Sequence, residues 1–178
     1  MKRIVSVLLF LLIVSSFCFS DDFNPGFEPI NYLEEPGLFG GLIVDATGIG
    51  IMSASGIISS IDLQAAIIMI QVSPILCSIG GSIMNSSISG HVEEWNAKGL
   101  NFDDSNFKSK AWAYTYATWG LTAGGLIAPL VIPSFEGAIA SIVLCGGAVI
   151  VETIGLYGVK RDWLMALNTA IYESGMAY

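Results

Sequence analysis

Basic side chains are scarce in this sequence, and so are charged side chains of either sign. Lys and Arg together number 7, against 15 Asp and Glu, which gives a formal net charge of −8 at pH 7. Binding to nucleic acid needs clustered basic side chains that neutralise phosphates, so this balance argues against it. Only 12% of the 178 residues are charged whereas 53% are hydrophobic, a composition typical of integral membrane proteins. We therefore expect the lipid bilayer, and no nucleic acid, among the partners of this chain.

Cysteine and histidine are too few to suggest a disulfide framework or a metal site. Cys18 falls in an N-terminal leader, while Cys77 and Cys145 fall in apolar stretches, where a thiol behaves as a small hydrophobic group. His91 is the only histidine, and the HVEEW sequence around it lacks the second histidine of a zinc-protease helix. The GxSxG motif of serine hydrolases is absent as well. We therefore expect no metal, no cofactor and no catalytic residue; a membrane-embedded enzyme is an alternative without motif support.

Residues 1–20 have the pattern of a secretory signal peptide. Lys2 and Arg3 form a basic start, Ile4 to Val14 form an apolar core, and smaller residues follow. The sequence leaves open whether this signal peptide is cleaved. Residues 21–36 are polar, acidic and rich in proline, and we expect them to form an exported, extended segment.

Four apolar stretches follow, and each is long enough to cross a bilayer as an α-helix. A helix rises about 1.5 Å per residue and the hydrocarbon core is about 30 Å thick, so about 20 residues suffice. Short turns separate the first stretch from the second and the third from the fourth, which predicts two helical hairpins. The predicted fold class is an all-α membrane protein, a four-helix transmembrane bundle of two hairpins after the signal peptide. The membrane domain is expected at residues 37–159, with spans at about 37–61, 63–84, 111–132 and 135–159.

Two further segments are predicted from their composition. Residues 89–110 are polar, and we expect them to form a loop in which His91 is a solvated side chain. Lys160 and Arg161 begin the tail, residues 160–178, where apolar side chains recur at helical spacing. This pattern predicts a short amphipathic C-terminal helix that lies on the membrane surface.

Small residues recur on one face of several predicted spans. In the first span Gly41, Asp45 and Gly48 are spaced by four and three residues, which places them on one helix face. Glu152 lies on a similar face of the fourth span. Small residues let helices approach closely, so we interpret these faces as helix contacts, with a pore or substrate path as the alternative. On the third span this face comprises Ala113, Ala117, Gly120, Gly124 and Ala128. The predicted packing residues are Gly41, Gly48, Gly120, Gly124 and Gly155.

Three polar side chains that fall inside the predicted spans are of interest, namely Asp45, Glu152 and Gln71. An ionised carboxylate in hydrocarbon is costly, so each acid must be protonated, paired or in contact with water. No Lys or Arg falls within a predicted span, so we do not expect an ion pair inside the membrane. Asp45 and Glu152 lie at similar depths, and the two carboxyls could share one proton if their helix faces meet. The alternative is that each acid reaches interfacial water by itself.

The basic residues conflict with the usual rule for membrane orientation. With residue 21 exported and four spans, every Lys and Arg after the leader falls on the exported side, whereas such residues usually stay on the other side. Three explanations are open: the acids on that side offset the basic residues, the glycine-rich first span does not cross, or the membrane is an outer membrane.

A short motif in the first span resembles a known family. Residues 45–50, DATGIG, in a glycine-rich span of a small exported protein, resemble the spirochaetal small integral outer-membrane proteins, the family of the Borrelia channel-associated surface protein. Residues 167–168, LN, and 170–171, AI, are also similar. The resemblance covers the first span and the tail. It implies an α-helical, surface-exposed protein of the bacterial cell envelope with channel-forming behaviour, and it implies no catalytic residues.

These features together predict a small envelope protein that is structural or channel-forming. Four closely packed helices leave little room for a pore, so a channel would need a homo-oligomer. The alternative is an accessory subunit of a transporter or secretion complex. The sequence leaves open whether the membrane is the inner or the outer one.

Overall fold

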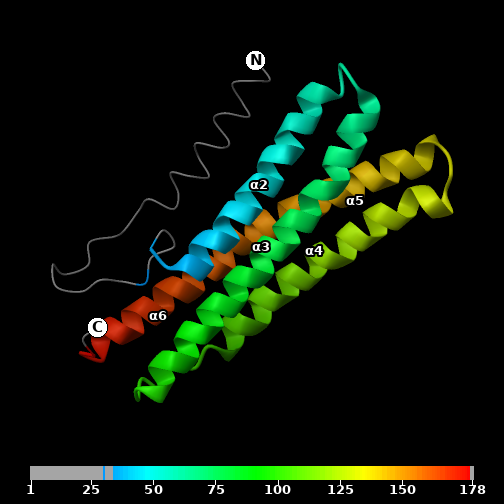
Figure 1. Ribbon diagram of the computed structural model, residues 1–178. Helices are drawn as coiled ribbons and strands as arrows, with labels where there is room; N and C mark the ends of the chain where they lie inside the picture. Colours follow the sequence, from blue (N-terminus) through cyan, green and yellow to red (C-terminus); the bar gives the residue numbers. More distant parts are fainter. Residues whose placement is uncertain (1–29, 31–33, 177–178) are drawn as a thin grey trace.

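The structure is a computed structural model that describes residue 30 and residues 34–176. Every regular element in this part of the chain is helical, which confirms the all-α prediction. The predicted signal peptide and most of residues 21–36 lie outside the described residues. The elements, labelled as in Figure 1, are α2 (Pro36–Ile58), α3 (Leu63–Ala97), α4 (Ser105–Val131), α5 (Phe135–Ile154), the π-helix η1 (Gly155–Lys160) and α6 (Arg161–Glu173).

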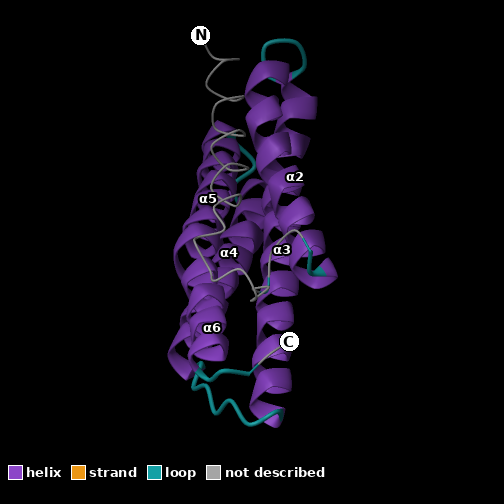
Figure 2. Ribbon diagram, turned by 90° about the vertical axis from the view of Figure 1, so that its left-hand side faces the viewer, coloured by secondary structure: helices purple, strands orange, loops and turns teal. Residues whose placement is uncertain are grey.

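The long helices form two hairpins that pack against each other. Residues 59–62 join α2 to α3, and residues 132–134 join α4 to α5. Both turns lie toward one end of the molecule, whereas the loop between α3 and α4 and the end of α6 lie toward the other (Figure 1). α3 is central, because it contacts α2, α4, α5 and α6. Figure 2 shows the long helices running roughly along a common direction.

Local signals in the sequence set the turn between α2 and α3. Pro36 begins α2. Proline is favourable there, because the backbone N–H that it lacks would have no hydrogen-bond partner within the helix. Ser59 and Ser60 return hydrogen bonds to the last carbonyls of α2. Asp62 then caps α3, because its side chain accepts a hydrogen bond from the Ala65 amide at 3.0 Å. Residues 59–62 therefore supply both the turn and the helix cap of the tight hairpin predicted at this point.

Three helices of the described part are long and apolar enough to cross a membrane. They are α2, α3 and the continuous helix Phe135–Glu173 that α5, η1 and α6 form together. The chain is accordingly an integral membrane protein by the length and composition of its helices. α4, which holds the predicted span 111–132, is not among the three, because polar and aromatic side chains interrupt its apolar residues.

Most of the predicted loop at residues 89–110 is helical, so that prediction was wrong. α3 and α4 extend into it from both sides and leave a loop of residues 98–104. The helix continues because Val92 and Trp95, three residues apart, are only 3% and 2% exposed, while their polar neighbours face outward. The outer face of an amphipathic helix has the composition of a loop, and composition alone could not separate the two.

α6 continues α5 through η1 and packs against α3 and α4, rather than forming a separate helix that lies on a membrane surface. Asn168 fastens residue 30 to it: its Oδ1 accepts from the Ile30 amide and its Nδ2 donates to the Ile30 carbonyl, each at 3.1 Å. The helical spacing of the tail did indicate the buried side, but the partner is the protein's own core. The buried residues of α6 are Trp163, Leu164, Leu167, Asn168 and Ile171.

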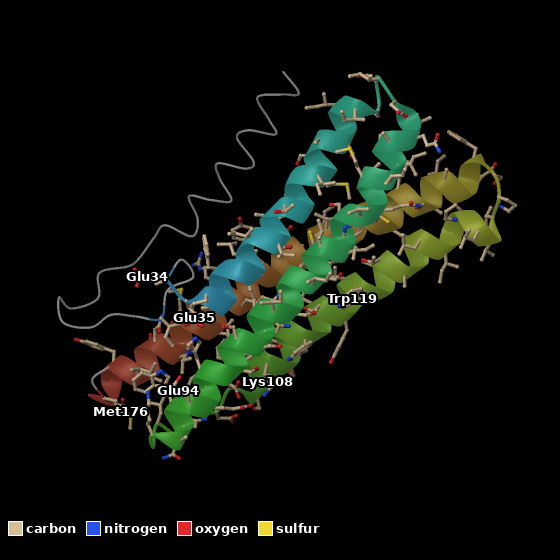
Figure 3. The ribbon with its side chains drawn as sticks, in the orientation of Figure 1. Glu34, Glu35, Glu94, Lys108, Trp119 and Met176 are labelled. Atoms are coloured by element: carbon tan, nitrogen blue, oxygen red, sulfur yellow. The ribbon has the colours of Figure 1, made fainter. Side chains whose placement is uncertain are left out.

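Two of the helices are longer than a bilayer is thick. At about 1.5 Å per residue, the 35 residues of α3 span about 52 Å and the 39 residues of Phe135–Glu173 about 58 Å. The hydrocarbon core is only about 30 Å thick, so both helices continue beyond it. Glu35, Glu94 and Lys108 lie toward the end with the loop (Figure 3), and the core around Trp95 and Trp163 fills the same region.

Candidate functional site

α2 and α3 approach so closely that their backbones are in contact. A methyl group at Gly41 would lie 2.9 Å from the Gly80 carbonyl oxygen, and one at Gly48 would lie 2.7 Å from the Ser73 carbonyl oxygen. The Ser73 hydroxyl donates to the Gly48 carbonyl at 2.5 Å. Gly41 and Gly48, both predicted packing residues, therefore lie in a seam where two helices meet backbone to backbone.

The other predicted packing glycines have different surroundings. A methyl group at Gly155 would lie 2.8 Å from the Tyr114 Cβ, so this glycine lies at a close contact between η1 and α4. One at Gly124 would make an ordinary contact of 3.4 Å with Leu144. Gly120 is exposed, and no atom of the described residues beyond its own helix backbone lies within 4 Å of such a methyl group. Gly120 therefore takes no part in a close approach to the other described residues.

The buried side of α4 differs from the small-residue face predicted for it. Ala113, Ala117 and Gly120 from the predicted face are exposed. Threonines lie inward instead, because a threonine hydroxyl can bond to the backbone of its own helix and so be buried with its donor satisfied. Thr122, for example, donates to the Thr118 carbonyl at 2.7 Å. The buried residues of α4 are Ala111, Thr115, Thr118, Thr122 and Gly125.

Asp45 lies in the α2–α3 seam with a relative exposure of 0%. Neither oxygen of its carboxyl has a hydrogen-bond partner among the described residues. The Cys77 thiol lies beside it but donates to the main-chain carbonyl of Asp45, with Sγ and O 3.7 Å apart. Tyr157 of η1 packs against the same region. Asp45 is therefore a buried acid that the helices enclose without pairing it.

Glu152 of α5 forms an ion pair with Lys160 of η1, and both side chains are fully buried. The Thr118 hydroxyl lies 3.0 Å from Glu152 Oε2 and also 3.0 Å from the Tyr114 carbonyl, so its single proton can serve one acceptor at a time. The sequence predicts no ion pair inside the membrane, whereas the structure shows a fully buried pair between Glu152 and Lys160. Lys160 had been placed in the surface tail, whereas the structure turns it into the core.

The π-helix η1 explains how Lys160 reaches Glu152. In an α-helix of 3.6 residues per turn, side chains eight residues apart point about 80° apart around the axis. A π-helix closes its turns from residue i to i+5 and so rotates less per residue. The six residues of η1 therefore bring Lys160 round to the face of Glu152. Gly81 of α3 leaves the space for the pair, because a methyl group there would lie 2.6 Å from Glu152 Cδ and 3.0 Å from Lys160 Nζ.

Asp45 and the ion pair lie against adjacent residues of α3. A methyl group at Gly80 would lie 2.9 Å from the Asp45 Cβ, whereas Gly81 faces the ion pair. The charges of Asp45, Glu152 and Lys160 are close enough to interact. Glu152 pairs with Lys160 rather than directly with the other acid. Within the described part of the chain, two carboxyls and one ammonium group thus share a region closed to solvent, which we call the buried charge cluster.

Other polar side chains connect the helices outside this cluster. Asn85 of α3 donates to the Thr115 hydroxyl of α4 at 3.1 Å, in a fully buried contact. Gln71, predicted as an intramembrane polar residue, donates to the Ser141 hydroxyl of α5 at 3.3 Å. These bonds tie α3 to both members of the second hairpin. Gln71 therefore acts in helix packing and lies apart from the buried acids in sequence and contacts.

His91, expected as a solvated loop side chain, lies on α3. Its Nε2 is 3.5 Å from a carboxylate oxygen of Glu35, and its Nδ1 is 4.0 Å from Glu94. The side chain is 18% exposed, so it is half-buried between two acids at the loop end of the molecule. Nothing in this position places it near the buried charge cluster.

Sequence reasoning singled out Asp45 and Glu152 but missed Lys160, Thr118 and Gly81. The sequence indicates that helix continues from the fourth span into the tail, but the inward direction of Lys160 depends on η1 and has no such signal. The signal for Thr118 was the spacing of Thr115, Thr118 and Thr122 by three and four residues, which places them on one helix face. A lysine directly after an apolar run usually marks the end of a span. Lys160 was therefore assigned to the membrane surface, and its ion pair with Glu152 was not predicted.

Among the described residues, no group of three or more His, Cys, Asp and Glu side chains could hold a metal ion. In comparisons with known proteins, no family model, no curated protein and no solved structure matches the chain. The buried charge cluster, with its two carboxyls and one ammonium group, is the candidate functional site of the described residues.

Proposed function

We propose that this chain is a small integral membrane protein of the bacterial cell envelope, structural or channel-forming, that works as a homo-oligomer. In this proposal α4 crosses the membrane with the other helices, so that the domain is a four-helix transmembrane bundle. The observation that carries the proposal is the outward face of α4. Over residues 113–123 its exposed side chains are small or aromatic rather than aliphatic, and covering by a second copy would account for this.

The contrast between outward faces is clear in the exposed residues. α2, α3 and α5 present aliphatic side chains outward, as lipid contact requires; examples are Ile43, Ile68, Val143 and Ile150. α4 presents small and aromatic residues along most of its length, namely Ala113, Tyr116, Ala117, Trp119, Gly120 and Ala123. Small residues on a helix allow a second helix to approach closely. Trp119 lies midway along α4 (Figure 3); its indole N–H donates to the Ser82 hydroxyl of α3 at 3.5 Å, while the side chain is still 40% exposed.

A pore is expected between copies rather than within one chain. The interior of a single copy is filled by large buried side chains, including Met84, Ile88 and Leu156. Protein interiors are packed about as densely as organic crystals, so such a core leaves no continuous water path. A channel therefore requires surfaces that several copies contribute.

The test is disulfide formation between copies at the outward face of α4. Ala117→Cys should yield an interchain disulfide in native membranes, whereas Val143→Cys on α5 should not, although Val143 is 64% exposed. The native Cys77 and Cys145 are buried and should not interfere. The particle mass in mild detergent is measured alongside. A single copy would contradict the proposal, and a stable complex with a different protein would favour the accessory-subunit alternative.

A further inference from the structure

We infer that Asp45, Glu152 and Lys160 form one occluded proton-binding site, in which a single exchangeable proton balances the charge that Lys160 leaves unmatched. This inference is independent of the proposed oligomer, because all three residues belong to one chain. It concerns a ligand, the proton, and a place in the core where it is held.

The argument begins with the charges in the cluster. Two carboxylates and one ammonium would leave a net charge of −1 among the described residues that line it. An unbalanced carboxylate removed from water is strongly unfavourable, so a site of this kind takes up a proton or a cation instead. Every member of the cluster has a relative exposure of 0%, so water does not screen the excess charge.

The position of the proton follows from the contacts. Glu152 is stabilised as a carboxylate, because Lys160 pairs with it and the Thr118 hydroxyl lies 3.0 Å from its Oε2. Among the described residues no ammonium pairs with Asp45, and the only donor beside its carboxyl is the weakly donating Cys77 thiol, so the proton resides on Asp45. The other ionisable side chains that face Asp45 are Cys77 of α3 and Tyr157 of η1, and both are neutral in their ordinary state near pH 7.

The three groups act as one site because α3 brings them together with glycines. Gly80 admits Asp45 from α2, and Gly81 admits the ion pair from α5 and η1. Lys160 has a long flexible side chain, so it can turn to whichever carboxylate is charged. The proton enters from water onto one carboxylate and returns to water from the same group, while the ammonium keeps its own protons throughout.

The experiment counts protonated carboxyl groups by infrared spectroscopy. The full chain is placed in lipid nanodiscs at neutral pH, with aspartate labelled at its side-chain carboxyl carbon. The wild type should show one protonated aspartate band, and Asp45→Asn should remove it. Glu152→Gln should remove it as well, since Lys160 is then free to pair with Asp45. The double variant Glu152→Gln with Lys160→Met leaves Asp45 again without a positive charge to balance it. In this variant the protonated aspartate band should return.

Each outcome decides the inference. The matched control is Glu136→Gln, at an exposed position near the start of α5. It should leave the protonated aspartate band unchanged. A wild type without a protonated aspartate would overturn the inference, even if some variants fail to fold. Sodium binding that depends on Asp45, seen by sodium NMR with no protonated band, would assign a cation in place of the proton. A band that persists in folded Glu152→Gln would mean that Asp45 is protonated independently of the pair.

Discussion

Gly81 illustrates how much one hydrogen atom in place of a side chain can matter in this core. We expect Gly81→Ala to destabilise the protein by about 1–3 kcal/mol, because the added methyl group overlaps Glu152 and Lys160. Gly90→Ala on the same helix is the control, since no atom of the described residues beyond the helix's own backbone lies within 4 Å of a methyl group there. The midpoint of thermal unfolding in detergent measures both. If the midpoint of Gly81→Ala equals or exceeds that of the wild type, the Glu152–Lys160 pair does not pack closely against Gly81.

At this scale the sequence identified the acids but not their partner. Asp45 and Glu152 stand out because a carboxylate in an apolar run is rare and has few solutions. Lys160 does not stand out, since a lysine after an apolar run has an ordinary interpretation as an interface residue. Its inward direction depends on η1, and a π-turn has no dependable sequence signal. The direction of the Lys160 side chain is therefore determined by backbone geometry rather than by residue type.

Among the elements, the α2–α3 seam depends on backbone contact. Gly48→Ala should reduce the resistance of the protein to SDS, because the methyl group would lie 2.7 Å from the Ser73 carbonyl and the helices would have to separate. Gly50→Ala is the matched control two residues away, where space is open. Circular dichroism during SDS titration follows the loss of helix. If both variants unfold at the same SDS fraction, the seam does not stabilise the hairpin.

A second element, α6, offers a test of where its apolar side is buried. Trp163→Ala should cost about 3–5 kcal/mol, as truncation of a fully buried aromatic side chain does. Met165→Ala on the outward side, where Met165 is 40% exposed, should change stability little. Amide hydrogen exchange along α6 reports the effect. A helix resting on lipid would instead lose affinity for vesicles and keep its folding stability, which would contradict the packing described for α6.

The elements also show why periodicity succeeded on some helices and failed on α4. On α2 the face chosen from the sequence is the one that the structure buries, with Gly41, Asp45 and Gly48, and on α5 it is the face that holds Glu152. On α4 threonines and small residues both recur at helical spacing. A rule that chooses the smallest side chains then selects the outward face. The hydroxyls of Thr118 and Thr122 could be buried because each can donate to a carbonyl of its own helix.

For the whole molecule, the arrangement of the hairpins predicts which segments share a side of the membrane. Cysteines at Ser105 and Ser174 should react with an impermeant thiol reagent from one side, because the loop and the end of α6 lie together. A cysteine at Ser60, in the opposite turn, should react only from the other side. Labelling of intact and permeabilised cells makes the comparison. Reaction of Ser105→Cys and Ser60→Cys from the same side would rule out a crossing by α3.

The overall architecture could be predicted from the sequence only in part. The three apolar helices and the short turns were evident, because a bilayer demands a minimum length of apolar residues. The extension of α3 and α6 beyond that length was not evident. Outside the hydrocarbon a helix needs only one buried stripe, and the polar residues on its other side conceal it.

The Glu152–Lys160 pair also bears on how the chain enters a membrane during synthesis. Both charges belong to one continuous helix, only eight residues apart, so this segment carries its own counter-ion before any other helix has folded. An isolated charge at a helix centre opposes insertion by about 2.5–3.5 kcal/mol. We therefore expect Lys160→Ala to lower insertion efficiency of the α5–α6 segment in a glycosylation-mapping assay, and Glu152→Gln with Lys160→Ala to restore it. Unchanged insertion of the single variant would mean that the pair forms only after assembly. Asp45 has no such companion in α2, so the biogenesis of that helix depends on a proton or on a later neighbour.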